Sequence, residues 1–295
     1  MRRNRLPGYI NNHWNARNIN HAIPHSCRNL GLRNDSYQST FPAVNSLVAN
    51  WDVFGSRSIE NGKWFNQVTL PADGSQASAY DFYLGTDASI QTTDPAIVNG
   101  NSWNESALEF NNSNSTRLNF ASGASTSFLD SFSSSSSDFT MEFVLSNFLQ
   151  APSGIWPILL ENSRTSPNNG MSIFMRGNSS NIIETNIFAD GAWVWGNYAS
   201  APPGNESGFI HFVLSLKHSN GYGLTSTNGV QVYTNNGLSA VSTNPASDLL
   251  VISNFGSLRT GSRVHYARMY NKALSLDQIA LLYTAAKKRF TQIIG

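Results

Sequence analysis

The clearest pattern in the chain is an alternation of residue types near its C-terminus, over residues 263–270. Two sets of residues take alternate positions in this run, which is the period of a β-strand whose two faces differ. A second alternation, over residues 139–145, predicts another such strand. In the first run Val264, Tyr266, Arg268 and Tyr270 alternate with His265, Ala267 and Met269, and in the second Phe139, Met141, Phe143 and Leu145 alternate with Thr140, Glu142 and Val144.

The period changes to that of a helix directly after residue 270. Ser275 precedes Gln278 by three positions, which is the spacing of a capping box, and Leu274 and Ile279 have the spacing of a hydrophobic staple. The pattern therefore predicts a helix over about 276–289, packed on the sheet edge through one apolar face. That face consists of Ile279, Leu282, Tyr283, Ala286 and Phe290.

The middle of the chain contains many short strand-like runs separated by Gly, Asn, Ser and Pro. Evenly spaced short strands of this kind favour a β-sandwich or a jelly roll. The predicted strands include 44–52, 117–120, 156–161, 171–176, 182–188, 209–217, 230–234 and 249–253.

Two stretches resemble a known family. Arg268-Met-Tyr-Asn-Lys-Ala-Leu-Ser-Leu-Asp-Gln-Ile279 resembles the end of laminin-G-like domains of the concanavalin A-like lectin/glucanase superfamily. Ala79-Tyr-Asp-Phe-Tyr-Leu-Gly-Thr-Asp87, with the runs 93–100 and 106–111, is similar to laminin-G-like modules of bacteriophage and large algal-virus structural proteins. The resemblance covers about residues 44–290 and implies an all-β fold, a concanavalin A-like jelly-roll β-sandwich. We assign the sandwich domain to residues 44–295, with an extended arm before it and a short C-terminal helix.

The charge distribution separates the first part of the chain from the rest. Residues 1–40 hold six of the 19 basic and one of the 18 acidic residues, leaving 13 bases and 17 acids for the remainder. We therefore interpret residues 1–43 as an extended basic arm that docks on acidic and apolar surface of a neighbouring subunit. The alternative is that the arm folds back on its own sandwich. The proposed assembly residues are Arg2, Arg3, Arg5, Tyr9, Trp14 and Arg17.

Other features exclude several classes of protein. The one cysteine, Cys27, excludes an intramolecular disulfide framework, and no run of 18 apolar residues exists to span a membrane. The first residues lack an apolar segment, so we expect no signal peptide. The arm has no motif that reads a nucleic acid, so we expect no specific nucleic-acid partner.

The chain lacks the signatures of the common hydrolases. Glucanases of this superfamily place two carboxylates on one strand face, and a retaining pair stands about 5–5.5 Å apart. No E-x-D-x-x-E run, G-x-S-x-G elbow or Cys-His signature exists here. We therefore predict no catalytic residues and no enzymatic activity. The isolated strand acids, interpreted as solvent-facing, are Glu109, Glu142, Glu161 and Glu184.

Metal and cofactor sites are not predicted either. No His or Cys cluster has the spacing of a zinc site. Asp81, Asp87 and Asp94 offer carboxylates for calcium, but none stands in a dedicated loop, and we interpret them as turn and capping residues.

One segment has the composition of a sugar site. Trp193 and Trp195 would share a face of a strand, with Tyr198 close behind them. Exposed aromatic rings beside amide groups suit pyranose recognition. The alternative, which we favour, is that these rings belong to the sandwich core.

Three functions remain open. The first is a non-enzymatic virion structural protein, capsid-decorating, minor capsid or tail-associated, in a homo-oligomer or multi-copy assembly with other virion proteins. The alternative is a carbohydrate-binding adhesin that recognises host surface glycans. The third is a glycan-cleaving enzyme.

Overall fold

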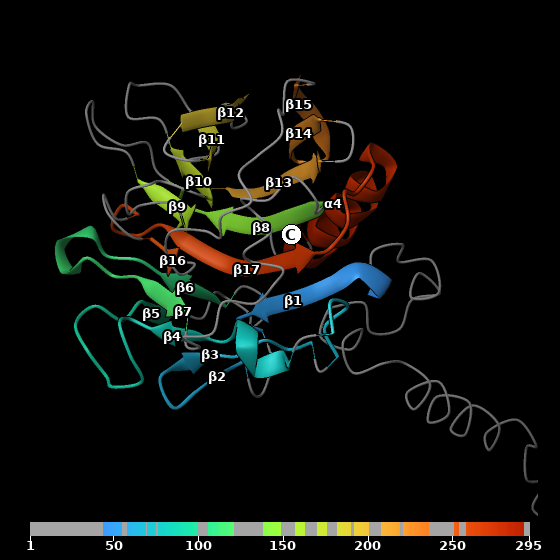
Figure 1. Ribbon diagram of the computed structural model, residues 1–295. Helices are drawn as coiled ribbons and strands as arrows, with labels where there is room; N and C mark the ends of the chain where they lie inside the picture. The colour runs from blue at the N-terminus through green and yellow to red at the C-terminus, as the bar shows by residue number, and fades with distance from the viewer. Residues whose placement is uncertain are drawn as a thin grey trace, which may run out of the picture.

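The computed structural model (Figure 1) describes residues 44–54, 58–68, 70–74, 76–98, 106–120, 138–148, 157–162, 170–175, 182–189, 192–200, 208–218, 221–235, 251–253 and 258–291. The arm predicted over residues 1–43 lies outside these ranges. The boundary between arm and sandwich therefore stays a prediction.

The first layer is an eight-stranded antiparallel sheet with the order β15-β14-β13-β8-β17-β6-β5, in which β1 also pairs with β17. Its long central strands carry the two predicted alternations. The strands are β1 (Leu47–Asp52), β5 (Ala96–Val98), β6 (Ala107–Glu109), β8 (Phe139–Ser146), β13 (Phe209–Lys217), β14 (Tyr222–Thr227), β15 (Val230–Asn235) and β17 (Arg263–Tyr270).

The second layer is a nine-stranded sheet with the order β12-β11-β10-β9-β16-β7-β4-β3-β2. Every pairing in it is antiparallel. Its strands are β2 (Ile59–Glu60), β3 (Lys63–Trp64), β4 (Phe82–Leu84), β7 (Leu118–Phe120), β9 (Ile158–Glu161), β10 (Gly170–Met175), β11 (Ile182–Ala189), β12 (Ala192–Ser200) and β16 (Val251–Ile252). Short 3-10 helices at Val44–Ser46 (η2), Ala77–Tyr80 (η3) and Asn112–Asn114 (η5) lie in the connections.

The main hydrophobic core fills the space between the two sheets. Phe139, Met141 and Phe143 of β8 point into it, as the alternation predicts. Aromatic rings from both sheets meet there: the ring centroids of Trp51 and Phe82 lie 5.0 Å apart in an edge-to-face arrangement. Such pairs add about 0.5–1.5 kcal/mol to the energy of burial.

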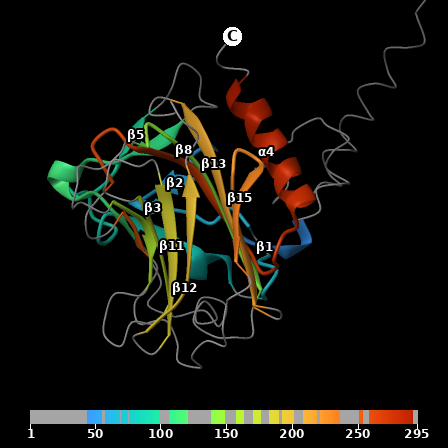
Figure 2. The ribbon, with the colours of Figure 1, turned by 90° about the horizontal axis from the view of Figure 1, so that it is seen from above.

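The helix α4 (Leu276–Thr291) covers the outer face of the eight-stranded sheet, on the side away from the nine-stranded sheet (Figure 2). The predicted capping box is present, because the Ser275 N–H donates to Gln278 Oε1 (3.0 Å) and the Gln278 N–H donates to Ser275 Oγ (3.4 Å). Leu274 and Ile279 are buried in one cluster, as a hydrophobic staple requires. Since α4 lies on this face, most of β8 is buried on both sides.

One detail of the predicted alternation in β17 is wrong. Val264 packs in the core between the sheets, whereas Tyr266 packs under α4. The register of β17 against β8 shifts between these two residues, which is a β-bulge. A bulge adds one residue to a strand, so the alternation restarts on the other face after it. As a result His265 and Tyr266 both approach Phe290 of α4.

The predicted fold class is confirmed in its main features. The described residues form two antiparallel sheets packed as a sandwich, and α4 is the α-helix that follows them.

Candidate functional site

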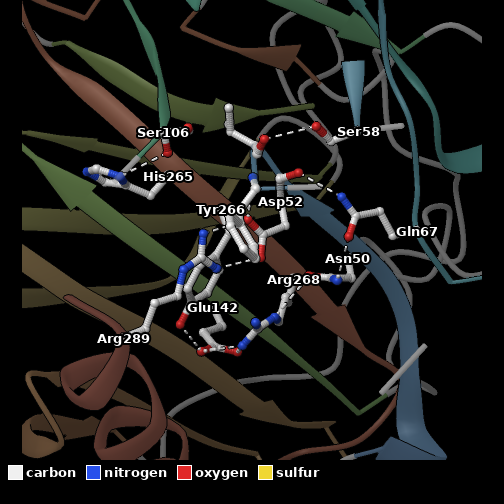
Figure 3. A network of polar contacts seen from close by, with 12 residues as sticks. Asn50, Asp52, Ser58, Gln67, Ser106, Glu142, His265, Tyr266, Arg268 and Arg289 are labelled. Carbon is white, nitrogen blue, oxygen red and sulfur yellow. Dashed lines mark hydrogen bonds and ion pairs between the residues drawn. The ribbon is translucent and has the colours of Figure 1, made fainter. Parts of the chain in front are cut away.

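A buried polar network lies between the eight-stranded sheet and α4, with Glu142 at its centre. Figure 3 shows side chains from β1, β8, β17 and α4 converging there. Glu142 Oε1 accepts a hydrogen bond from the Tyr266 hydroxyl (2.7 Å) and lies 3.0 Å from His211 Nε2. Its Oε2 accepts from the Tyr270 hydroxyl at 2.5 Å, and Arg268 Nη1 reaches both oxygens at 3.3 and 3.4 Å.

The electrostatics of this network keep Glu142 ionised. Burial raises the pKa of Glu142, but the Arg268 charge and the hydrogen bonds from His211 and Tyr270 together lower that pKa to about 2. Burial and the Glu142 charge raise the pKa values of Tyr266 and Tyr270, so both hydroxyls remain donors. The network is therefore centred on a fixed Glu142–Arg268 ion pair in which both carboxylate oxygens accept hydrogen bonds.

A second ion pair joins α4 to β1. Arg289 Nη1 lies 2.6 Å from Asp52 Oδ2, and Nη2 lies 2.9 Å from Asp52 Oδ1. Asp52 is fully buried, and the Arg289 side chain is 8% exposed. A bidentate pair of this kind fixes both position and orientation.

The interpretation of the strand acids as solvent-facing is wrong for three of them. Glu142, Glu161 and Glu184 are buried, and only Glu109 is partly exposed, in an ion pair with Arg263 (2.8 Å). Glu142 was misread because α4, which covers its face, follows more than a hundred residues later. With both carboxylate oxygens engaged, Glu142 has a structural role.

The outer face of the nine-stranded sheet carries a different kind of feature, a continuous line of directly paired residues across all its strands. We call it the outer row. Each residue is the Cα partner of the next, because the strand registers line up at this level. The outer row consists of Glu60, Lys63, Tyr83, Asn119, Val251, Glu161, Ser172, Asn186 and Gly196.

The row faces away from the core. Neighbours of its members along the strands, such as Trp64, Phe82 and Leu160, are completely buried between the sheets. Successive side chains in a strand point to opposite faces, so the described side chains of the row, among them Lys63, Tyr83 and Asn119, point outward. Tyr83 and Asn119 are half-buried in the row, whereas Glu161 and Ser172 near its middle are buried.

Some row members make contacts with one another or with neighbours on the same face. Lys63 Nζ lies 5.4 Å from the centre of the Tyr83 ring. At the other end, the Asn186 amide donates to Glu184 Oε1 (3.2 Å), one pleat away on β11. Glu184 is the Cα partner of Phe174, which is half-buried on the same face. An aromatic ring, amides and carboxylates therefore share one face of the sheet.

The sequence-predicted sugar residues lie on β12, at the end of this row. Tyr198 is the Cα partner of Glu184, and Gly196 is that of Asn186. Trp195 pairs with Ile187 and Trp193 with Phe188, and the register shifts between these pairs, which interrupts the simple alternation that predicted a shared face. The side chains of Trp193, Trp195 and Tyr198 lie outside what the structure describes, so their exposure stays a prediction.

Sequence reasoning missed most of the outer row. Its members come from strands of two to nine residues spread over residues 59–252. No local pattern reports which residues of distant strands become partners. The one feature of the sequence that drew attention to a row member was the resemblance of residues 79–87, which include Tyr83, to laminin-G-like modules.

The two buried acids of this face lie on different strands, whereas the glucanase pair sought in the sequence would share one strand. Glu161 on β9 and Glu184 on β11 are separated by β10 and by one pleat. Strand spacing and rise place their Cα atoms about 12 Å apart.

Of the aspartates considered for calcium, Asp87 and Asp94 have turn roles, and Asp81 bonds a backbone N–H fifteen residues away. Asp87 Oδ1 accepts from the Ser89 N–H (2.7 Å), Asp94 Oδ2 accepts from the Gln91 N–H (3.1 Å), and buried Asp81 accepts from the Asn66 N–H (2.9 Å). Within the described ranges, no group of three or more His, Cys, Asp and Glu side chains gathers as metal ligands would. The absence of a required metal stays a prediction.

Solved structures share this fold. The chain superposes on the binding domain of botulinum neurotoxin DC in complex with rat synaptotagmin II, with a TM-score of 0.58 and 8% identity over 82% of this chain and 52% of the other. It also matches the botulinum neurotoxin serotype G binding domain, with a TM-score of 0.57 and 12% identity over 82% of this chain and 51% of the other. The binding domain of Paraclostridial Mosquitocidal Protein 1 superposes with a TM-score of 0.55 and 16% identity, over 82% of this chain and 52% of the other.

These matches establish the fold, a concanavalin A-like jelly-roll sandwich, which confirms the predicted fold class. The chain spans about half the length of the structures it matches. No protein-family profile matches the chain, and no curated protein does. Among the described residues, none of the helices combines the length and apolar character needed to cross a membrane.

Proposed function

We propose that this chain is a non-enzymatic carbohydrate-binding module and that the outer row is its glycan-binding surface. The observation that carries the proposal is the alignment of nine strands at one level, which produces a line of polar and aromatic residues on one face. Its exposed and half-buried members on adjacent strands, Glu60, Lys63, Tyr83 and Asn119, span about 14 Å by strand spacing, long enough for a short oligosaccharide.

The chemistry of the row suits sugars. Amide groups at Asn119 and Asn186 offer donors and acceptors for sugar hydroxyls, while Tyr83 offers an aromatic surface. A binding site of this kind combines a flat apolar surface with a few fixed polar groups. Tyr198 of β12, the Cα partner of Glu184, would lie one pleat from the end of the row.

The solved structures with this fold support a binding role. The matched neurotoxin and mosquitocidal structures are described as binding domains, one in complex with synaptotagmin II and another, of botulinum neurotoxin DC, with SialylT. They support a glycan or receptor partner better than a catalytic role. Because fold does not determine function, the proposal rests on the outer row.

A glycan array probed with the purified chain tests the proposal. We expect binding to a defined glycan class that falls at least tenfold in Tyr83→Ala and in Asn119→Ala. The matched control is Gln231→Ala, an exposed polar residue on β15 of the other sheet, which should bind as the wild type does. Absence of binding across the array, or equal binding by the row variants, would contradict the proposal. A reducing-sugar assay on each bound glycan should show no cleavage.

We also propose a second function, that of a structural component of a virion docked by residues 1–43. The basic composition of that segment and the resemblance of residues 79–87 and 268–279 to viral laminin-G-like modules support it. Immunogold labelling of purified particles tests it. Label on capsid or tail is the expected result, and unlabelled particles would refute it.

A further inference from the structure

A pocket of about 410 Å³ opens where the β13–β14 hairpin meets the first turn of α4. We call it the helix-end pocket. Leu224 and Leu274 in its lining are buried, and Tyr222 is half-buried. Leu276, the first residue of the helix, also lines it and is 39% exposed. The pocket is thus a mainly apolar hollow with an exposed leucine at its edge.

The rim of the pocket carries polar groups of both signs. Lys217 and Asp277 line it, and both are exposed. An apolar hollow with a polar rim is the usual form of a site that receives one large side chain from a partner.

The chain enters the sandwich beside this pocket. Leu47 belongs to the same hydrophobic cluster as Leu224 and Leu274. The Asn271 N–H donates to the Ser46 carbonyl (2.9 Å), which holds the start of β1 against the loop that leads to residues 273–277. The start of the described sandwich therefore lies beside the wall of the pocket.

We propose that the helix-end pocket of one copy binds the segment around Trp14 of a second copy of this chain. Tyr9, Trp14, Ile19 and Ile23 recur every four to five residues in an otherwise polar stretch. Such a stretch has anchors but cannot form a core of its own. An indole ring buries about 150–250 Å² of surface when it enters a pocket.

The length of the spacer favours a second copy over the same chain. The start of β1 lies beside its own pocket, so a segment that docked in that pocket would need only a few linking residues. Residues 24–43 instead separate the last anchor from Val44 and can extend for about 65 Å. A domain of this size is about 50 Å across, so the spacer is long enough to reach a neighbouring copy.

The test uses the full chain and two variants with one defect each. Trp14→Glu removes the anchor and keeps the pocket, and Leu276→Glu blocks the pocket and keeps the anchor. Sedimentation equilibrium should show that the wild type self-associates and that each variant associates at least tenfold more weakly. Leu281→Glu is the matched control, since Leu281 is a 45% exposed leucine of α4 outside the pocket lining, and it should associate as the wild type does.

Mixing the two variants separates exchange between copies from docking within one chain. A mixture of Trp14→Glu and Leu276→Glu contains intact anchors on one variant and intact pockets on the other. We expect the mixture to associate more strongly than either variant alone. A mixture that stays monomeric, a monomeric wild type, or a variant that associates normally would overturn the proposal. Lys217→Glu serves as a second pocket variant should Leu276→Glu fail to fold. Glycan binding is not needed for any of these results.

Discussion

Arg289 in the last turns of α4 and Asp52 at the end of β1 form a bidentate ion pair, with N–O distances of 2.6 and 2.9 Å, across 237 positions of sequence. The pair joins the helix, through a buried carboxylate, to the strand that begins the described sandwich. It lies beside Tyr266, whose ring is 5.7 Å from the Arg289 guanidinium carbon and 4.0 Å from that of Arg268. The last helix is therefore held by a specific polar contact as well as by apolar packing.

We expect Arg289→Ala to lower the free energy of unfolding by about 3–5 kcal/mol, because it leaves the buried Asp52 carboxylate without its partner. Urea denaturation measures the change. Lys287→Ala, at an exposed position on the same helix, should change stability by less than about 0.5 kcal/mol. Equal effects of the two substitutions would show that the ion pair is unimportant.

The low pKa of Glu142 predicts a loss of stability in acid. Its pKa is about 2 in the folded protein and 4.5 when unperturbed, so the unfolded state takes up a proton first as the pH falls. The stabilisation is complete above about pH 4.5 and is lost between that pH and about pH 2, with a size on the order of 3 kcal/mol.

Urea denaturation at pH values between 2 and 6 measures this loss. Glu142→Gln should be less stable at pH 6, since it leaves Arg268 buried without a counter-charge, and its stability should depend less on pH. Glu109→Gln, in a partly exposed ion pair, is the control and should keep the wild-type pH dependence. An unchanged pH dependence in Glu142→Gln would contradict the assignment.

The apolar face of α4 should contribute strongly to stability. Ile279 and Leu282 are 0% and 1% exposed, so replacing either by Ala should lower the free energy of unfolding by about 2–5 kcal/mol. Leu281→Ala, on the exposed side of the helix, should have an effect of less than about 1 kcal/mol. Chemical denaturation distinguishes these cases, and similar losses at all three positions would argue against the observed packing.

Gly229 is required by its contact with the helix as well as by its backbone angle. It has a φ of +76°, and a Cβ there would lie 2.6 Å from Cδ1 of Tyr283. Gly74 has a φ of +79° with nothing within 4 Å of its Cβ position. Both Gly→Ala changes therefore meet the same backbone strain, and only Gly229→Ala adds a clash. We expect it to be the more destabilising of the two in thermal unfolding, and the reverse order would refute the contact.

Local sequence patterns determined the elements that depend on neighbouring residues. The capping box at Ser275 and Gln278, the staple of Leu274 and Ile279, and the alternation of β8 each involve residues within a few positions of one another. Propensity and periodicity report such contacts directly. The β-bulge in β17 was missed because it depends on how β17 pairs with a distant strand.

The tertiary structure alone decided which distant residues meet. Glu142 is buried because Arg268, Tyr270 and α4 come to the same face of the sheet, and its local sequence is equally consistent with a solvent-facing acid. The outer row likewise depends on the registers of eight strand pairings, which no single strand encodes. Antiparallel pairing joins segments far apart in sequence, and the free energy that selects one register comes from burying whole faces, so neither feature is readable from local pattern.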